Sequence, residues 1–242
     1  MKFLIIQLLI TVLFLTYAFS HPRNHYHKPT CDISSNPGSL LIKPATGSCF
    51  NSGDKIPFTF IPGSDVPSSL DKVQLAITYD GTIVLKTNVA LKPGKDKYSF
   101  TFTVPDNTTL PSPSDARYEI GFDDWKLTSG TFSINHPKFG LTIYEPKIKE
   151  CYEAGQTVTI RWEDPFHKYQ RIDITKIDIY NNVAQQWTNL VSKSIPVRHG
   201  QYDITLPKTL AKQNGYVFGI LVKRNGKDEH YYSNPFSVTT AI

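Results

Sequence analysis

Apolar and polar residues alternate along several short segments of the chain. Residues 98–104 read Tyr-Ser-Phe-Thr-Phe-Thr-Val and residues 202–206 read Tyr-Asp-Ile-Thr-Leu, while residues 172–180 alternate more loosely. A period of two is typical of β-strands with one buried face. Turn-forming pairs such as Asp80-Gly81 and Asn225-Gly226 separate these runs. Short alternating strands at close, regular spacing predict antiparallel β-sandwiches.

The pattern of residues 40–134 recurs in residues 141–238. Cys49 matches Cys151, Gly53 matches Gly155, and Tyr98 to Pro105 meets Gly200 to Pro207, all at an offset of 102 positions. The strands at residues 56–60 and 158–162 also match at this offset. The sequence therefore predicts one all-β module of about a hundred residues present twice in tandem. We place the modules at residues 39–136 and 137–242, with a short linker at residues 135–140.

The N-terminal twenty residues have the pattern of a secretory signal peptide. Lys2 precedes a run of almost entirely apolar residues at 3–15, and Ala18-Phe19-Ser20 follows with small residues where signal peptidase reads. A single membrane-spanning helix is the alternative, but the run is shorter than the roughly 20 residues that a span needs. We expect residues 1–20 to be cleaved and the protein to be secreted, extracellular or in the cell wall, without a stable membrane anchor. Residues 21–38 read as a flexible, histidine-containing arm.

Charge and cysteine content narrow the picture. The net charge is +5 at pH 7 and no basic run occurs, so we do not expect a nucleic-acid partner. An odd number of cysteines in an oxidising compartment needs an explanation. Cys31 and Cys49 are close enough in sequence to form a disulfide, whereas Cys49 and Cys151 occupy equivalent positions of separate modules. Cys151 is then expected as a buried free thiol or an intermolecular one.

The second module carries a set of motifs in a recognisable order. These are Ile143, Pro146, Ala154-Gly155, Val158, Ile160, Trp162, Tyr202, Pro207, Tyr216 and Ser233-Asn234-Pro235-Phe236-Ser237-Val238. They resemble the N-terminal domain of the fungal KRE/KNH-type cell-wall synthesis family, which also occurs in Ser/Thr-rich GPI-anchored fungal proteins. The first module is similar to a drifted version, with Phe60 in place of Trp162. The resemblance implies an extracellular Ig-like or fibronectin-like sandwich associated with the cell wall and β-glucan, and it implies no catalytic residues.

Enzymatic alternatives can be stated from particular residues. Cleavage after Ser20 would expose His21 at the new N-terminus, with His25 and His27 nearby. Neutral imidazoles are good copper ligands, as in copper-dependent polysaccharide oxidases. Pro22 and the polar arm argue against a built site, so we expect no metal and no cofactor. Asp123-Asp124 is better explained by a turn than by a glycosidase carboxyl pair, because adjacent strand residues point to opposite faces.

Carbohydrate binding would use exposed aromatic rings flanked by polar groups. The candidates near expected turns or strand edges are Trp125, Trp187, Tyr231 and Tyr232, whereas Trp162 is expected in the core. Ordinary sandwich packing remains the alternative for each of them. Asn107 begins an Asn-Thr-Thr glycosylation sequon in an expected loop.

We therefore expect a non-enzymatic, secreted, cell-wall-associated protein. We expect it to bind or organise β-glucan. Its expected partners are therefore this wall polysaccharide or proteins of the wall. The alternative is a protein-interaction module that engages a host or wall protein through an exposed strand edge. The remote alternative is the copper oxidase using His21.

Overall fold

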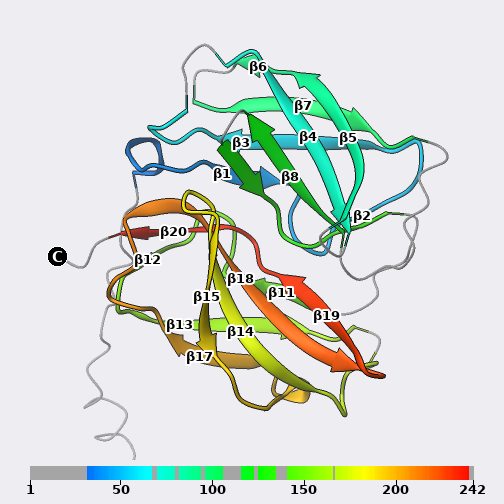
Figure 1. Ribbon diagram of the computed structural model, residues 1–242, viewed down its shortest axis with the longest axis vertical. Helices are drawn as coiled ribbons and strands as arrows, with labels where there is room; N and C mark the ends of the chain where they lie inside the picture. The colour runs from blue at the N-terminus through cyan, green and yellow to red at the C-terminus, as the bar shows by residue number, and fades with distance from the viewer. Residues whose placement is uncertain are drawn as a thin grey trace, which may run out of the picture.

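The computed structural model of the chain contains two β-sandwich domains stacked end to end (Figure 1). It describes residues 32–66, 70–79, 82–93, 96–105, 116–122, 125–134, 141–165 and 167–239. Within these ranges the chain forms no α-helix, only strands and two short 3-10 turns, η1 (Ile33–Ser35) and η2 (Val197–His199). The all-β sandwich architecture predicted from the alternating pattern is thereby confirmed.

The described part of the first domain contains ten strands in two main sheets. They are β1 (Leu40–Lys43), β2 (Cys49–Phe50), β3 (Lys55–Ile61), β4 (Lys72–Tyr79), β5 (Thr82–Ala90), β6 (Lys92–Pro93), β7 (Tyr98–Thr103), β8 (Ala116–Phe122), β9 (Trp125–Thr128) and β10 (Ser133–Ile134). One sheet has the order β1-β3-β7-β6 and the other β5-β4-β8-β9, while β10 pairs with β2 in parallel. Stacked rings fill the core, with Phe58 and Phe100 at 4.7 Å and Phe60 and Tyr98 at 5.3 Å between ring centroids. Alternation puts these four side chains on the inner face.

The described residues of the second domain form the other ten strands. They are β11 (Thr142–Glu145), β12 (Cys151–Glu153), β13 (Thr157–Glu163), β14 (Asp173–Asn181), β15 (Gln186–Val191), β16 (Ile195–Pro196), β17 (Gln201–Thr205), β18 (Gln213–Arg224), β19 (Lys227–Tyr232) and β20 (Phe236–Thr239). The smaller sheet has the order β11-β13-β17. The larger has the order β12-β20-β18-β14-β15, with β16 on β14 and β19 on β18. Trp162 lies in the core, as predicted, and its indole Nε1 donates a hydrogen bond to the carbonyl oxygen of Val197 at 2.7 Å.

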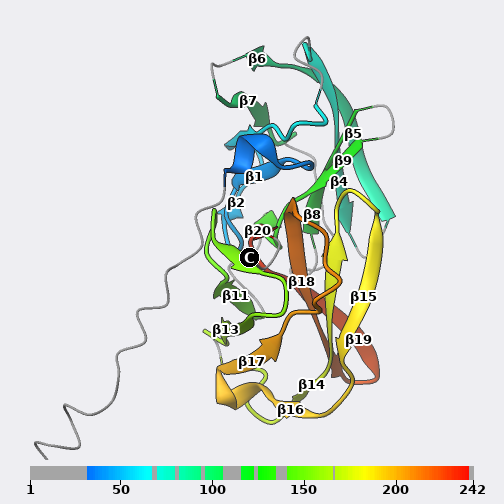
Figure 2. The same cartoon turned by 90° about the vertical axis from the view of Figure 1, so that its left-hand side faces the viewer.

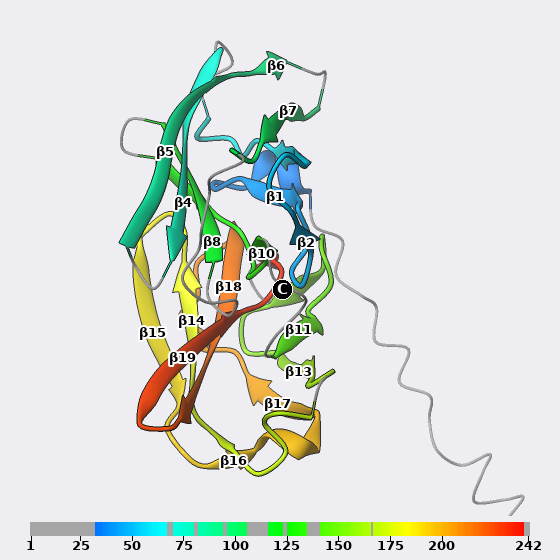
Figure 3. The same ribbon diagram turned by 90° about the vertical axis from the view of Figure 1, so that its right-hand side faces the viewer.

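The two domains share most of their strand pairings, although β6 pairs with β7 in the first domain and β16 pairs with β14 in the second. In each, the first strand pairs with the third and shifts register after its second residue, at Leu41 and at Ile143. In each, the second strand pairs in parallel with the tenth, and the fourth lies between the fifth and the eighth. The sheets β5-β4-β8-β9 and β15-β14-β18-β19 lie on the same side of the molecule (Figures 2 and 3).

Residues 32–38 differ from the flexible arm that their polarity suggested. Asn36 is fully buried, and Asn214 of the second domain bonds the surrounding backbone. The Asn214 side-chain nitrogen donates to the carbonyl oxygens of Ile33 at 2.7 Å and Gly38 at 2.8 Å, and its backbone N–H donates to Pro37 at 2.9 Å. Since these carbonyl groups are satisfied by Asn214, the segment is fixed against the second domain. The expected signal peptide, His21, His25 and His27, and the linker at residues 135–140 lie outside the described residues.

A second group of hydrogen bonds joins the domains beside β19. The backbone N–H of Tyr232 donates to Thr131 Oγ1 at 2.9 Å, and its carbonyl oxygen accepts from Thr46 Oγ1 at 2.8 Å. The backbone N–H of Thr46 donates to Asn234 Oδ1 at 2.8 Å. Gly130 lies so close to the Ser233 carbonyl oxygen that an added Cβ would come within 2.8 Å of it. The joint between the domains is therefore built from direct polar contacts.

The cysteine expectations need correction. Cys151 is buried and disulfide-bonded, so it is not a free thiol. Because the chain has three cysteines, a bond at Cys151 within the single chain excludes the expected Cys31–Cys49 pair. Cys49 is exposed on β2, and Cys31 lies outside the described residues. Proximity in sequence favoured the wrong pair. It carries no information about the contact between residues 32–38 and Asn214 of the second domain.

Candidate functional site

The outer face of the larger sheet in the second domain carries side chains from four strands. On β18, Phe218 and Ile220 are fully buried in the core, so Gly219 between them faces outward. The strand register places Gly219 beside Asp178 of β14 and Tyr232 of β19, and Trp187 of β15 lies opposite Tyr180. Residues opposite one another on neighbouring strands share a face. This face is where aromatic and polar groups meet.

Four aromatic side chains gather there. The Trp187 ring centroid lies 4.8 Å from that of Tyr180 and 5.7 Å from that of Tyr232, and His230 stacks on Tyr232 at 6.4 Å. We call Tyr180, Trp187, His230 and Tyr232, together with Gly219, the aromatic face. The exposed fraction of Trp187 is 37%, whereas that of Tyr232 is 9%. Trp187 is thus an exposed ring that its neighbours hold in place.

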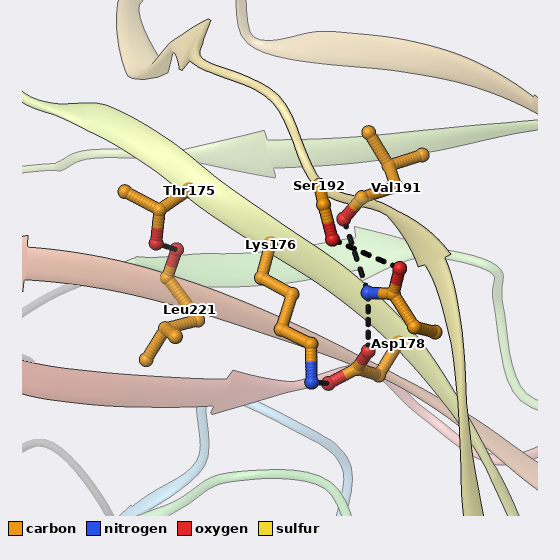
Figure 4. Close-up of polar contacts among 7 residues, drawn as sticks. Thr175, Lys176, Asp178, Val191, Ser192 and Leu221 are labelled. Atoms are coloured by element: carbon orange, nitrogen blue, oxygen red, sulfur yellow. Dashed lines mark hydrogen bonds and ion pairs between the residues drawn. The ribbon is translucent and has the colours of Figure 1, made fainter.

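Polar side chains continue the same face along β14 and β15 (Figure 4). Asn189 Nδ2 donates to Asp178 Oδ1 at 2.9 Å, and Ser192 Oγ donates to Asn189 Oδ1 at 2.9 Å. Lys176 Nζ lies 2.8 Å from Asp178 Oδ2. We call Lys176, Asp178, Asn189 and Ser192 the polar patch. Its one positive and one negative charge are paired, so it presents hydrogen-bonding groups with no net charge.

The structure places the four aromatic residues that were predicted to bind carbohydrate in different environments. Trp187 and Tyr232 both belong to the aromatic face. Tyr231 has an exposed fraction of 1% and points into the core, so it is excluded as a surface contact. Trp125 lies on β9 of the first domain, and its side chain is outside what the structure describes. Asn107 lies outside the described residues.

Sequence reasoning missed Tyr180 and His230. Tyr180 ends the loosely alternating run 172–180, in which Ile177 and Ile179 are core residues. Because Ile179 is a core residue, the alternation within this run already places Tyr180 on the outer face. The same rule separates Tyr231 from Tyr232, because consecutive strand residues point to opposite sides. The phase of β19 follows only from its pairing with β18, which the sequence does not specify.

Tyr231 belongs to a polar network on the inner side of β19. The hydroxyl groups of Tyr169 and Tyr231 lie 2.7 Å apart and donate to Glu229 Oε2 at 2.6 and 2.8 Å. Arg224 Nε donates to Glu229 Oε1 at 2.9 Å. Burial raises the pKa values of both tyrosines. Burial alone would raise the pKa of Glu229, but the hydrogen bonds from Tyr169, Tyr231 and Arg224 outweigh it and lower that pKa. The carboxylate therefore acts as an ionised anchor that joins Tyr169 to β19.

Within the described ranges, His, Cys, Asp and Glu side chains form no group of three that could hold a metal ion. The same ranges contain no helix long and apolar enough to cross a membrane.

Comparison with known proteins bears on the second domain. Residues 145–238 match the family model of the Kre9/KNH-like N-terminal Ig-like domain. No curated protein matches the sequence.

Solved structures with similar arrangements have low identity. The fibronectin(III)-like modules of Clostridium thermocellum CbhA match at 12% identity and a TM-score of 0.22, over 85% of this chain and 94% of that one. The tandem Ig repeats of Dlar match at 13% identity and a TM-score of 0.28, over 86% of this chain and 100% of that one. Salmonella α-2-macroglobulin matches at 10% and 0.29, over 86% of this chain, which spans 15% of that protein.

The family match coincides with the motifs that suggested it. It begins at Glu145, beside Pro146, and ends at Val238, where the Ser-Asn-Pro-Phe-Ser-Val motif closes on β20. The first domain lies outside the match, so its origin as a drifted copy stays a prediction. The second domain of this chain, over residues 145–238, is therefore similar to the Kre9/KNH-like N-terminal Ig-like domain, a domain of a cell-wall-related family.

Proposed function

We propose that the protein is a non-enzymatic, secreted, cell-wall-associated protein that binds β-glucan through the aromatic face of its second domain. The observation that carries this proposal is the exposed ring of Trp187, held between Tyr180 and Tyr232 on a sheet surface. Sugar rings have apolar faces that stack on aromatic rings, and burying such a face is favourable in water. The similarity of residues 145–238 to the Kre9/KNH-like domain supports a cell-wall setting for this proposal.

The polar patch supports a neutral sugar as the ligand. Sugar hydroxyl groups both donate and accept hydrogen bonds, and Asp178, Asn189 and Ser192 offer both functions beside Trp187. The Lys176–Asp178 ion pair leaves no charge to attract an acidic polymer. A polymer of uncharged hexoses, such as β-glucan, fits this chemistry better than an acidic polysaccharide.

A binding role is favoured over catalysis by the state of the carboxylates in this domain. Asp178 is engaged by Lys176 and Asn189, and Glu229 is engaged by Arg224 and two tyrosines. Glycoside hydrolysis requires two carboxyl groups facing one cleft about 5 to 10 Å apart. The aromatic face presents no such pair among its described residues.

Co-sedimentation with insoluble polysaccharides tests the proposal. The whole protein is incubated with β-1,3-glucan, β-1,6-glucan and chitin particles, and the bound fraction is measured for it and for Trp187→Ala. We expect retention on a β-glucan and a loss of at least about tenfold in affinity for Trp187→Ala. Val183→Ala is the matched control, because Val183 is also exposed, at 46%, but lies off the aromatic face. A protein that stays in solution with every polysaccharide would contradict the proposal.

The edge of the same sheet favours a second candidate, binding of a host or wall protein by strand addition. Strand β15 is the last strand of its sheet, and its residues Gln186–Val191 include no charged residue and no proline, the usual protection of edge strands. Isolated cell walls distinguish the two functions. Protease treatment of the walls would remove a protein partner, whereas glucanase treatment would remove the polysaccharide. Retention that survives protease and is lost with glucanase supports the glucan proposal.

A further inference from the structure

Tyr232 makes two separate sets of contacts, one through its ring and one through its backbone. Its ring belongs to the aromatic face, 5.7 Å from Trp187 and stacked with His230. Its backbone belongs to the domain joint, where Thr131 Oγ1 accepts its N–H and Thr46 Oγ1 donates to its carbonyl oxygen. The backbone N–H of Thr131 also points to that oxygen at 3.4 Å. Both polar groups of one peptide residue of the second domain are therefore held by the first domain.

The position of Trp187 depends on its neighbours within the face. Tyr180 supports the ring on one side and is paired with Trp187 on adjacent strands of the same hairpin. Tyr232 supports it on the other side, across Gly219. Of the two supports, Tyr232 is the one whose backbone is bonded by the first domain. If the two domains moved relative to each other at the joint, Tyr232 would move with them and would change the position of Trp187.

The contacts that follow Tyr232 leave little room for such a shift. The backbone N–H of Thr46 donates to the side-chain oxygen of Asn234. The backbone of Gly130 packs directly against the carbonyl oxygen of Ser233, with no room for a Cβ atom between them. Asn234 is itself fixed, because its side-chain nitrogen donates to the Pro146 carbonyl oxygen at 3.3 Å. Close-packed elements of this kind move as discrete units rather than by gradual deformation.

We propose that the first domain is a positioning element for the aromatic face: Thr46 and Thr131 hold Tyr232, and Tyr232 holds the ring of Trp187. Loosening the joint then exposes Trp187 and weakens ligand binding. By linkage, a ligand on the face stabilises the docked arrangement of the domains. The ligand half of this inference rests on the proposed glucan function, whereas the coupling between the joint and Trp187 does not.

The experiment uses the whole chain with paired substitutions. Thr46→Val and Thr131→Val remove the hydroxyl groups that bond Tyr232, while Thr46→Ser and Thr131→Ser keep them. Thr159→Val is the distant control, because Thr159 Oγ1 bonds Asp203 on the opposite sheet. The first readout is acrylamide quenching of Trp187 fluorescence, isolated by subtracting each variant's Trp187→Phe counterpart. The second is affinity for β-glucan particles, with thermal unfolding followed to verify folding.

The coupling predicts that each Val variant raises the quenching of Trp187, and that affinity for β-glucan falls roughly fivefold, the effect of losing about one net hydrogen bond. The Ser variants and Thr159→Val should behave as the unmodified protein. Unchanged quenching in both folded Val variants would overturn the coupling. If one Val variant does not fold, the other decides, since the remaining threonine still bonds Tyr232 there. Increased quenching without glucan binding by any variant would support the coupling and contradict the glucan function.

Discussion

Trp187 lies directly across Gly219 on the outer face of the second domain. A Cβ atom on Gly219 would come within 2.8 Å of Trp187 Cζ3 and 3.1 Å of Cη2. A glycine inside a strand often marks a close approach by another group. Here the approaching group is the indole ring, so the absent side chain allows Trp187 to lie against the sheet with its other surface exposed.

This contact predicts that Gly219→Ala displaces Trp187 while the ring itself is retained. The ring must move by some tenths of an ångström, because a Cβ cannot occupy the same space. We expect weaker retention on β-glucan, by about three- to tenfold, with the thermal midpoint nearly unchanged. Gly226→Ala is unsuitable as a control because of its positive φ, so Val183→Ala serves again. Full retention by Gly219→Ala would show that the ring's position does not determine binding.

Two buried asparagines allow a matched test of the domain joint. Asn214 bonds Ile33 and Gly38 through its side-chain nitrogen, and its Oδ1 accepts from Ser237 Oγ at 2.7 Å. Asn182 is also buried, yet its side-chain oxygen and nitrogen have no hydrogen-bond partner among the described residues. We expect Asn214→Ala to lower the free energy of unfolding by about 3 kcal/mol and Asn182→Ala by less than about 1 kcal/mol. Chemical denaturation of both variants measures the difference.

Equal losses for the two asparagine variants would contradict this account, since both remove the same side chain from a buried position. Limited proteolysis provides a second readout. Asn214→Ala should also make the segment at residues 32–38 more susceptible to cleavage, because its carbonyl groups lose their partner.

Glu229 predicts a specific acid dependence of stability. Its pKa is lowered in the folded protein, since hydrogen bonds from Tyr169, Tyr231 and Arg224 outweigh its burial. A lowered pKa stabilises the fold above the unfolded value of about 4.3 and ceases to do so as the pH falls through the folded pKa. We expect Glu229→Gln to be less stable than the unmodified protein at pH 7, with the gap narrowing below about pH 4. Thermal midpoints from pH 7 to pH 3 measure this, and a gap that widens at low pH would contradict it.

The position of Cys151 predicts its disulfide partner. Cys151 on β12 pairs with Ser237 on β20, Ser237 bonds Asn214, and Asn214 bonds Ile33, two residues after Cys31. Cys31, two residues before Ile33 in the sequence, is therefore the partner that we expect for Cys151, whereas Cys49 lies on β2 of the first domain. We expect a Cys31–Cys151 peptide in a non-reduced digest, and a loss of about 4 kcal/mol for Cys151→Ser because the loop is long. A Cys49–Cys151 peptide would contradict this assignment.

The all-β class and several individual strands could be predicted from the sequence. Alternation at residues 98–104 and 202–206 places β7 and β17 correctly, and the offset of 102 residues anticipates the matching of β3 with β13. Trp162 was correctly placed in the core by its alignment with Phe60. These features are local, because strand periodicity and turn residues are written in neighbouring positions.

The contacts between distant segments could not be predicted in this way. Asn214 and Ile33 are 181 residues apart, and nothing in their local sequence indicates that they meet. The burial of Tyr231 and the support of Trp187 by Tyr232 depend on the register of β19 against β18. A one-residue change of register would exchange the two tyrosines. The sequence therefore indicated where strands form but not which strands pair or in which register.

Hydroxyl-radical footprinting of the whole protein with and without a soluble β-glucan tests the central claim most directly. The oxidation of Trp187 is measured by mass spectrometry, with the exposed Tyr144 of the opposite sheet as the internal reference. Binding at the aromatic face predicts that the glucan protects Trp187 and leaves the oxidation of Tyr144 unchanged. Unchanged oxidation of Trp187 at a glucan concentration that saturates binding would show that the polysaccharide binds elsewhere and would contradict the account.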